Sequence, residues 1–80
     1  SAVAFVLRGV AYGNMGQYAQ AIEDYDAALQ ISPRLAEALY GRGVVKQKSG
    51  DNAGGAADLA AAQAIDQNIS YKTVMLGIAR

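Results

Sequence analysis

With 80 residues and 52% hydrophobic side chains, the chain is expected to form a single domain over residues 1–80 around a small core. Its seven basic and seven acidic residues cancel, so no overall field attracts phosphate backbones or anionic lipid, and we expect neither a nucleic-acid nor a membrane partner. The absence of cysteine and histidine excludes disulfides, cysteine nucleophiles, imidazole bases and zinc sites built on these residues.

Along the chain, apolar and small residues recur at helical spacing in five stretches, which predicts an all-α fold. The expected helices cover residues 2–14, 18–31, 35–48, 52–65 and 70–80. Gly16 and Gly50 break the chain within each pair of helices, Ser32 is expected to cap the third helix with Pro33 at its first position, and Asp51 to cap the fourth. Because the connections are short, each pair should form an antiparallel hairpin.

The chain contains an internal repeat of 34 residues, because Gly9, Gly43 and Gly77 share this spacing, as do Gly16 and Gly50. Aligning the two complete units gives eleven identities. Such a period is typical of stacked units, each of which buries its apolar face on the next. The predicted organisation is repeat one at residues 2–35, repeat two at 36–69, and a terminal helix or truncated third repeat at 70–80.

Glycine inside a helix is unfavourable by about 1 kcal/mol relative to alanine. Gly9 and Gly43, at equivalent points, therefore indicate that a neighbouring helix passes too close for a side chain. We interpret Tyr12, Tyr18 and Tyr25 as fillers of the core and of the contacts between helices, not as a cofactor site, and we expect no cofactor.

A pair of opposite charges recurs in both units, as Arg8 with Asp24 and as Arg42 with Asp58. The repeated separation predicts two equivalent salt bridges between the helices of each hairpin. Each is worth at most about 1 kcal/mol if exposed, so they would fix register more than stability. Because no nucleophile has an evident base, we expect no enzymatic activity.

The first unit resembles the tetratricopeptide repeat, whose signature of aromatic and small residues it carries at Phe5, Gly9, Tyr12, Ala21, Tyr25, Ala28 and Pro33. The second unit is more divergent, and its matching residues are Leu39, Gly43, Gly55, Leu59 and Ala62. Lys46 there replaces the tyrosine and Gln67 replaces the proline. The resemblance implies a right-handed superhelical stack of antiparallel helix hairpins, with five helices in two full repeats plus a terminal helix.

In proteins of this family the first helix of every hairpin lines a concave face that binds the ligand. Carried onto this sequence, the ligand-binding stripe comprises Val3, Val6, Val10, Asn14, Glu37, Tyr40, Val44, Lys48, Tyr71, Val74 and Ile78. Its central positions are apolar, which favours an apolar ligand. The family's clamp for a terminal carboxylate is not expected, because its polar positions are occupied by Val6, Val10, Gly41, Tyr71 and Met75.

The leading hypothesis is therefore a scaffold for protein–protein interaction that binds a peptide or helix in this apolar groove. One alternative is self-association through the groove and the apolar last helix, which lacks the polar cap that the ends of such stacks require. A further alternative is that the chain is a piece of a longer array, in which the next helix covers that surface. A lesser alternative is a helical-repeat protein that binds RNA.

Overall fold

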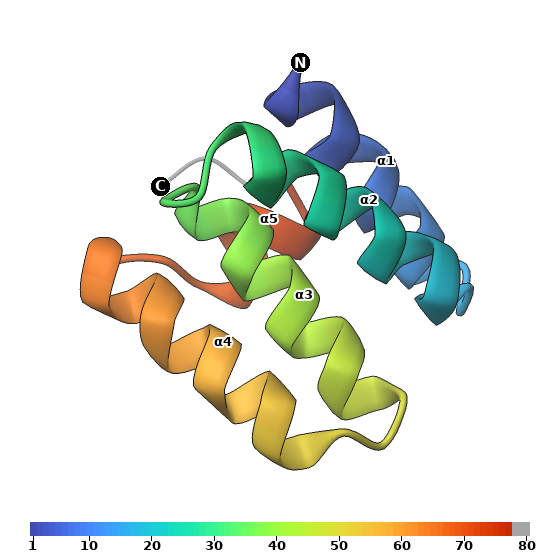
Figure 1. Cartoon of the computed structure of the whole chain (residues 1–80). Coiled ribbons are helices and arrows are strands. Elements are labelled where there is room, and N and C mark those ends of the chain that lie inside the picture. Colours follow the sequence, from blue (N-terminus) through green and yellow to red (C-terminus); the bar gives the residue numbers. More distant parts are fainter. Residues whose placement is uncertain (78–80) are drawn as a thin grey trace.

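The computed structural model describes residues 1–77, and residues 78–80 lie outside the described part. Within residues 1–77 the chain forms five α-helices and no strand: α1 (Ala2–Asn14), α2 (Tyr18–Ile31), α3 (Ala36–Lys48), α4 (Asn52–Ile65) and α5 (Tyr71–Met75). Helices α1 and α2 form one hairpin and α3 and α4 a second, and α3 also packs against α2 and α1 (Figure 1). The predicted all-α fold of stacked helix hairpins is thereby confirmed.

The ends of the helices follow local chemistry. The Ser1 hydroxyl accepts a hydrogen bond from the Ala4 amide at 3.2 Å at the start of α1, and the Asp51 carboxylate accepts one from the Gly54 amide at 2.9 Å at the start of α4. Both satisfy amides that a helix leaves unpaired in its first turn. Gly16 and Gly50, with φ of +77° and +106°, make the turns within the hairpins, as the sequence predicts.

The expected start of the third helix was wrong. Ser32 ends α2, because its amide donates to the Ala28 carbonyl at 2.9 Å, and the Leu35 amide then donates to the Ser32 carbonyl at 3.1 Å. This second bond closes a four-residue turn in which Pro33 takes the second place, a position that favours proline. Helix α3 therefore begins only at Ala36, with Leu35 as its capping residue.

The core is built around Tyr25, whose side chain is fully buried. A Cβ atom at Gly9 would lie 3.0 Å from its ring, and one at Gly41 would collide with that ring. In the second hairpin, a Cβ atom at Gly43 would lie 2.8 Å from the Gly55 carbonyl oxygen of α4. The expectation that Gly9 and Gly43 mark close approaches of neighbouring helices is therefore confirmed.

Both predicted salt bridges are present. Arg8 Nε lies 2.8 Å from Asp24 Oδ2, and Arg42 Nε lies 2.7 Å from Asp58 Oδ2; each arginine makes a second hydrogen bond to the same carboxylate. Arg42 also reaches Asp26 of the preceding hairpin, with 2.9 Å between Nη1 and Oδ1. The Arg42 side chain thus joins both hairpins.

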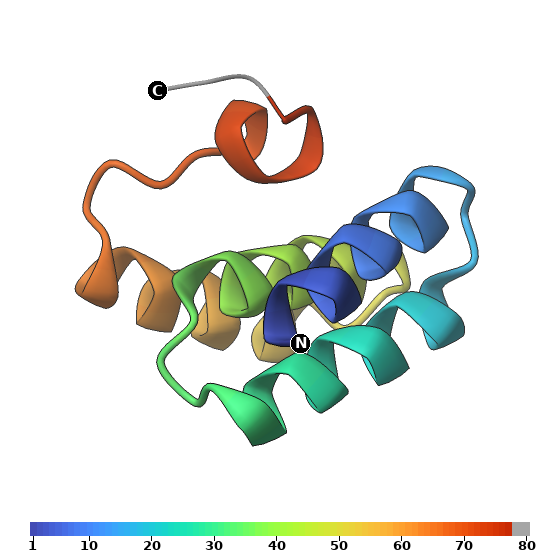
Figure 2. The ribbon, with the colours of Figure 1, turned by 90° about the horizontal axis from the view of Figure 1, so that it is seen from above.

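The fifth helix differs from the prediction for residues 70–80. It begins at Tyr71 and ends at Met75, and Gly77, with φ of +69°, takes a conformation that cannot continue a helix. In the described part of the chain, α5 packs against α3 and α1 rather than against α4. Figure 2 shows it lying on the side of α1 and α3 that faces away from α2.

Candidate protein-binding face

The predicted ligand stripe lies on the surface of α1 and α3 that carries α5, which we call the α1/α3 face and define by Val6, Val10, Tyr40 and Val44. Val6 and Val44 are buried, each with 8% of its surface exposed, while Val10 and Tyr40 are half-buried. At the edges, Glu37 is half-buried, and Val3, Asn14 and Lys48 are exposed. Ile78 lies outside the described residues.

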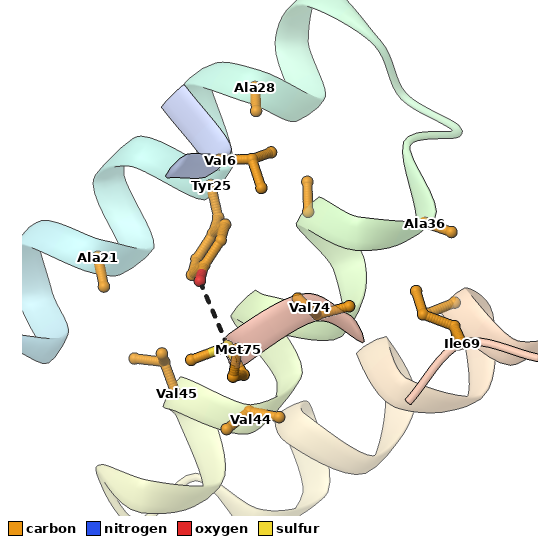
Figure 3. Close-up of a cluster of buried hydrophobic side chains, with 12 residues drawn as sticks. Val6, Ala21, Tyr25, Ala28, Ala36, Val44, Val45, Ile69, Val74 and Met75 are labelled. Atoms are coloured by element: carbon orange, nitrogen blue, oxygen red, sulfur yellow. Dashed lines mark hydrogen bonds between the residues drawn. The ribbon is translucent and has the colours of Figure 1, made fainter. Parts of the chain in front are cut away.

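Helix α5 covers the middle of this face (Figure 3). Val74 and Met75 point into it and are almost fully buried, with exposures of 7% and 1%. Val74 thus belongs to the same buried apolar cluster as Val6 and Val44. Helix α5 nevertheless lies across α1 and α3 and does not continue their row (Figure 2). Tyr71, at the start of α5, is exposed. Residues of this chain thus occupy the surface on which the sequence predicts a ligand.

Met75 is the most completely buried residue of α5. Its Sδ atom lies 3.8 Å from the Tyr25 hydroxyl oxygen, and its Cε atom would lie 3.5 Å from a Cβ atom at Gly13. Burial raises the pKa of the Tyr25 hydroxyl, and the charge of Asp24 raises it further, so this hydroxyl stays protonated and can act as a weak donor to sulfur. Gly13, Tyr25 and Val45 together form a socket for one long, unbranched side chain.

Two polar side chains of the α1/α3 face hold the two ends of α5. The Asn14 side-chain amide donates to the Met75 carbonyl oxygen at 3.2 Å, and so satisfies a carbonyl that a helix leaves unpaired in its last turn. Lys48 lies with its Nζ 3.3 Å from the Tyr71 hydroxyl oxygen and 5.5 Å from the centre of the ring. Helix α5 therefore crosses the face from Lys48 on α3 to Asn14 on α1.

Beside α5 the face remains open. A cavity of about 350 Å³ lies between α1, the beginning of α3 and the end of α5. It is lined by Val3, Val6, Leu7, Val10, Leu35, Glu37, Thr73, Val74, Met75, Leu76 and Gly77. Three of its apolar side chains, Val3, Leu7 and Leu76, are more than half exposed. Glu37 is the acidic residue in this lining, so the cavity is an apolar surface with one negative edge.

Two cations of α3, Arg42 and Lys46, are engaged away from this face. Lys46 Nζ lies 3.1 Å from Asp58 Oδ2, and Arg42 binds the same carboxylate. Burial opposes ionisation of Asp58, but the hydrogen bonds and charges of Arg42 and Lys46 outweigh it, and the pKa of this carboxyl falls below its ordinary value. Lys48 is thus the cation of α3 that the α1/α3 face presents.

Two of the carboxylate-clamp positions named above, Gly41 and Val6, are closely packed in the structure. Gly41, at one of the clamp positions, lies under the Tyr25 ring, and even a Cβ atom there would overlap the ring. Val6, at another, is buried under α5. A long basic side chain therefore has no room at Gly41 while Tyr25 fills the core.

Within residues 1–77, no cluster of three or more acidic side chains is placed to hold a metal ion. In the same part of the chain, no helix has both the length and the hydropathy needed to cross a membrane.

The sequence profile of the TPR repeat matches residues 9–50, slightly more than half of the chain. The chain belongs to the tetratricopeptide repeat family. A relative is the "Photosystem I assembly protein Ycf3" of Acaryochloris marina, which is 35% identical over 51 residues. This match covers 64% of the chain and 31% of the relative, so the chain spans about a third of that protein's length. No solved structure matches the chain.

Tetratricopeptide repeats generally mediate protein–protein interaction. Sequence reasoning nevertheless missed several residues of the candidate site. Leu7, Leu35, Thr73 and Leu76 line the cavity, and Met75 fills the socket. Leu7 and Leu76 could have been found as large apolar residues outside the repeat signature, but the position of Met75 depends on where α5 packs, which the 34-residue period does not determine.

Proposed function

We propose that this tetratricopeptide repeat is a protein-binding scaffold whose α1/α3 face holds a short, apolar helical segment of a partner protein. The observation that supports this most is the segment that the face already carries. Helix α5 buries Val74 and Met75 in the same apolar cluster as Val6 and Val44, and the Met75 carbonyl accepts a hydrogen bond from Asn14. A partner helix with a similar apolar edge would meet the same partners.

The energetics favour an apolar partner. Burying an aliphatic side chain is worth about 1.5–3 kcal/mol, and the cavity beside α5 offers exposed Val3, Leu7 and Leu76 to such side chains. The single acidic group at its edge, Glu37, favours a basic or neutral flank in the partner. In this proposal the chain acts by binding and not by catalysis. A role in assembly is consistent with the name of the relative, an assembly protein of photosystem I.

The test is a selection against the full chain from a display library of helical peptides of about 12–15 residues, the length at which isolated helices become marginally stable. The selected peptides are then measured against Leu7→Asp and Val3→Asp. Ile31→Asp is the matched control, because Ile31 is similarly exposed, at 58% against 66% for Leu7 and 61% for Val3, but does not line the cavity. We expect the cavity variants to weaken binding at least about tenfold, with no change in the control. Equal binding by all variants, or selection of only polar peptides, would contradict the proposal.

The alternative of self-association had its basis in an uncovered apolar edge on the last helix. In the structure Val74 and Met75 of that helix are buried within the same chain, so the remaining basis is the exposed trio Val3, Leu7 and Leu76. Light scattering across a range of concentrations separates the two ideas. A monomer favours binding of a different protein, whereas a dimer that Leu7→Asp dissociates favours self-association.

A further inference from the structure

We propose that residues 69–77 are an internal competitor, which occupies the α1/α3 face in the absence of a partner and which the partner's helical segment displaces. This inference rests on the proposed function and adds its regulation. It follows from the segment's small anchorage, from the socket that it fills, and from the open cavity beside it.

The segment is held by few contacts. It joins α4 through residues 66–70, which form no helix or strand, and α5 is only five residues long. Its buried side chains are Ile69, Val74 and Met75. A helix of this length is not stable by itself in water, so α5 persists only while the face holds it. A capping box between Ser70 and Thr73 supports its first turn.

The two hairpins do not depend on α5 for their own assembly. The contacts between α1 and α2, between α2 and α3, and between α3 and α4 are made without it. The Arg42 side chain joins Asp58 and Asp26 across the hairpins with no residue of α5. Release of residues 69–77 would therefore uncover the socket of Gly13, Tyr25 and Val45 and leave the stack folded.

The contacts of α5 also define what can replace it. The socket accepts a methionine, because Gly13 leaves room for an unbranched chain above Val45. Asn14 donates its hydrogen bond to a main-chain carbonyl, so at this point the partner needs only a free carbonyl at the end of a helical turn. A partner segment with a β-branched residue directly before a methionine, at the end of a helical turn, would meet these contacts.

The cavity gives the partner a place to begin. Its wall of Val3 and Leu7 is exposed while α5 is in place, and its other wall is the end of the segment itself, at Leu76 and Gly77. A longer apolar helix can bind along α1 first and then take the socket from Met75. Because it would bury Val3 and Leu7 as well, it would cover more of the face than α5 does.

The chain offers a direct readout, because it has two methionines with opposite surroundings. Met75 is 1% exposed and lies beside the Tyr25 ring, whereas Met15 is 63% exposed at the end of α1. In the full chain with labelled methionine methyl groups, the Met75 signal should move toward the position of an exposed methionine in proportion to bound peptide, while the Met15 signal stays. A peptide that binds while the Met75 signal does not move would overturn the proposal.

Variants of the full chain give the second readout, with a fluorescent peptide of the sequence of residues 67–77 as probe. Met75→Asp should release the segment and bind this probe at least about tenfold more tightly than the wild type, because an occupied face lowers the apparent affinity. Lys72→Asp is the matched control, since it brings the same residue type into the same segment at an exposed side chain that does not line the cavity; its affinity should equal that of the wild type. Affinities of wild type and Met75→Asp within about twofold of each other would overturn the proposal.

The outcomes separate this inference from the proposed function. If neither the wild type nor folded Met75→Asp binds the probe or any library peptide, the face does not hold helical segments and both ideas fail. If peptides bind and Leu7→Asp weakens them, but Met75 stays in its socket, the function stands and the competition is wrong. A wild-type dimer that Met75→Asp dissociates would mean that the segment is exchanged between two copies, which also overturns the proposal.

Discussion

Helices α3 and α5 stand at equivalent places in the 34-residue repeat, but only one of them is part of the stack. Residues 36–43 and 70–77 both end in a glycine, Gly43 and Gly77. Gly43 is buried inside α3, where the lack of side chains at Gly43 and Gly55 lets α3 and α4 come into close contact. Gly77 has no atom within 4 Å of an added Cβ and adopts φ of +69°.

The difference shows that a glycine at this repeat position can either lie packed inside a helix or end one. A glycine is unfavourable in a helix unless something is gained from its lack of a side chain. In α3 that gain is contact with α4, whereas the Gly77 position gains no such contact. The same residue type therefore continues one helix and ends the other, and the shortened helix folds back onto the α1/α3 face.

The largest expected effect on stability comes from replacing Tyr25, the residue that contacts both α3 and α5. Tyr25 touches Gly41 of α3 and Met75 of α5, and Tyr25→Ala should lower the free energy of unfolding by about 3–5 kcal/mol. Denaturation followed by circular dichroism measures this loss. Tyr18→Ala, at a half-buried tyrosine of the same helix, should lose distinctly less, and equal losses would mean that Tyr25 is not the centre of the core.

The comparison between α3 and α5 is tested by replacing Gly43 and Gly77 with alanine. Gly43→Ala should lower stability by about 1–3 kcal/mol, because the new methyl group would lie 2.8 Å from a main-chain oxygen of α4. Gly77→Ala meets no atom and should change the global free energy of unfolding by less than about 1 kcal/mol. Similar losses at the two positions would show that Gly77 is packed as Gly43 is.

A fall in pH should affect the helix stack and the packing of α5 differently. The pKa of Asp58 is lowered in the folded chain, so the stability it contributes is present above its unfolded pKa and is lost as the pH falls through the folded pKa. Asp58→Asn should lose less stability between neutral and acidic pH than the wild type, by about 1 kcal/mol. The hold on Met75 includes no carboxylate, so its methyl signal should stay unchanged until the stack itself unfolds. Identical acid profiles of variant and wild type would contradict the role of Asp58.

The smallest expected effect on stability is confined to α5. Asn14→Ala removes the hydrogen bond to the Met75 carbonyl and should weaken the hold on the segment by about 0.5–1 kcal/mol. The measure is amide exchange in α5, which should quicken, while the exchange of α3 stays as it was. Gln20→Ala, at an exposed residue of α2, is the control that should alter neither.

The parts of the fold also differ in how far they could be predicted from the sequence. The four long helices and the pairs Arg8–Asp24 and Arg42–Asp58 were predictable, because the repeat places the same side chains at the same separation twice. The start of α3 was not, since Ser32 and Pro33 fit a helix start as well as the turn that they form. Which of these forms depends on how α2 and α3 pack, and that is a property of the whole stack.

Of the candidate site, the stripe on α1 and α3 could be located from the repeat, but the occupant could not. Val74 is apolar in any arrangement, and whether it extends the face or covers it depends on the short link after α4. Met75 fits a socket made by Gly13, Tyr25 and Val45, residues from three helices that no local pattern relates to each other. The sequence therefore predicts the residues of the α1/α3 face, whereas the position of α5 on that face depends on long-range packing.

Native-state hydrogen exchange tests most directly the claim that α5 is a separable cover on an intact stack. The Val74 amide donates to the Ser70 carbonyl in α5, and its exchange should be at least about a hundredfold faster than that of the interior amides of α3, through local opening. Met75→Ala should speed the exchange of α5 further and leave α3 unchanged. Exchange of α5 and α3 at one common rate, with both accelerated together by Met75→Ala, would show that α5 opens only with the whole fold and would contradict the account.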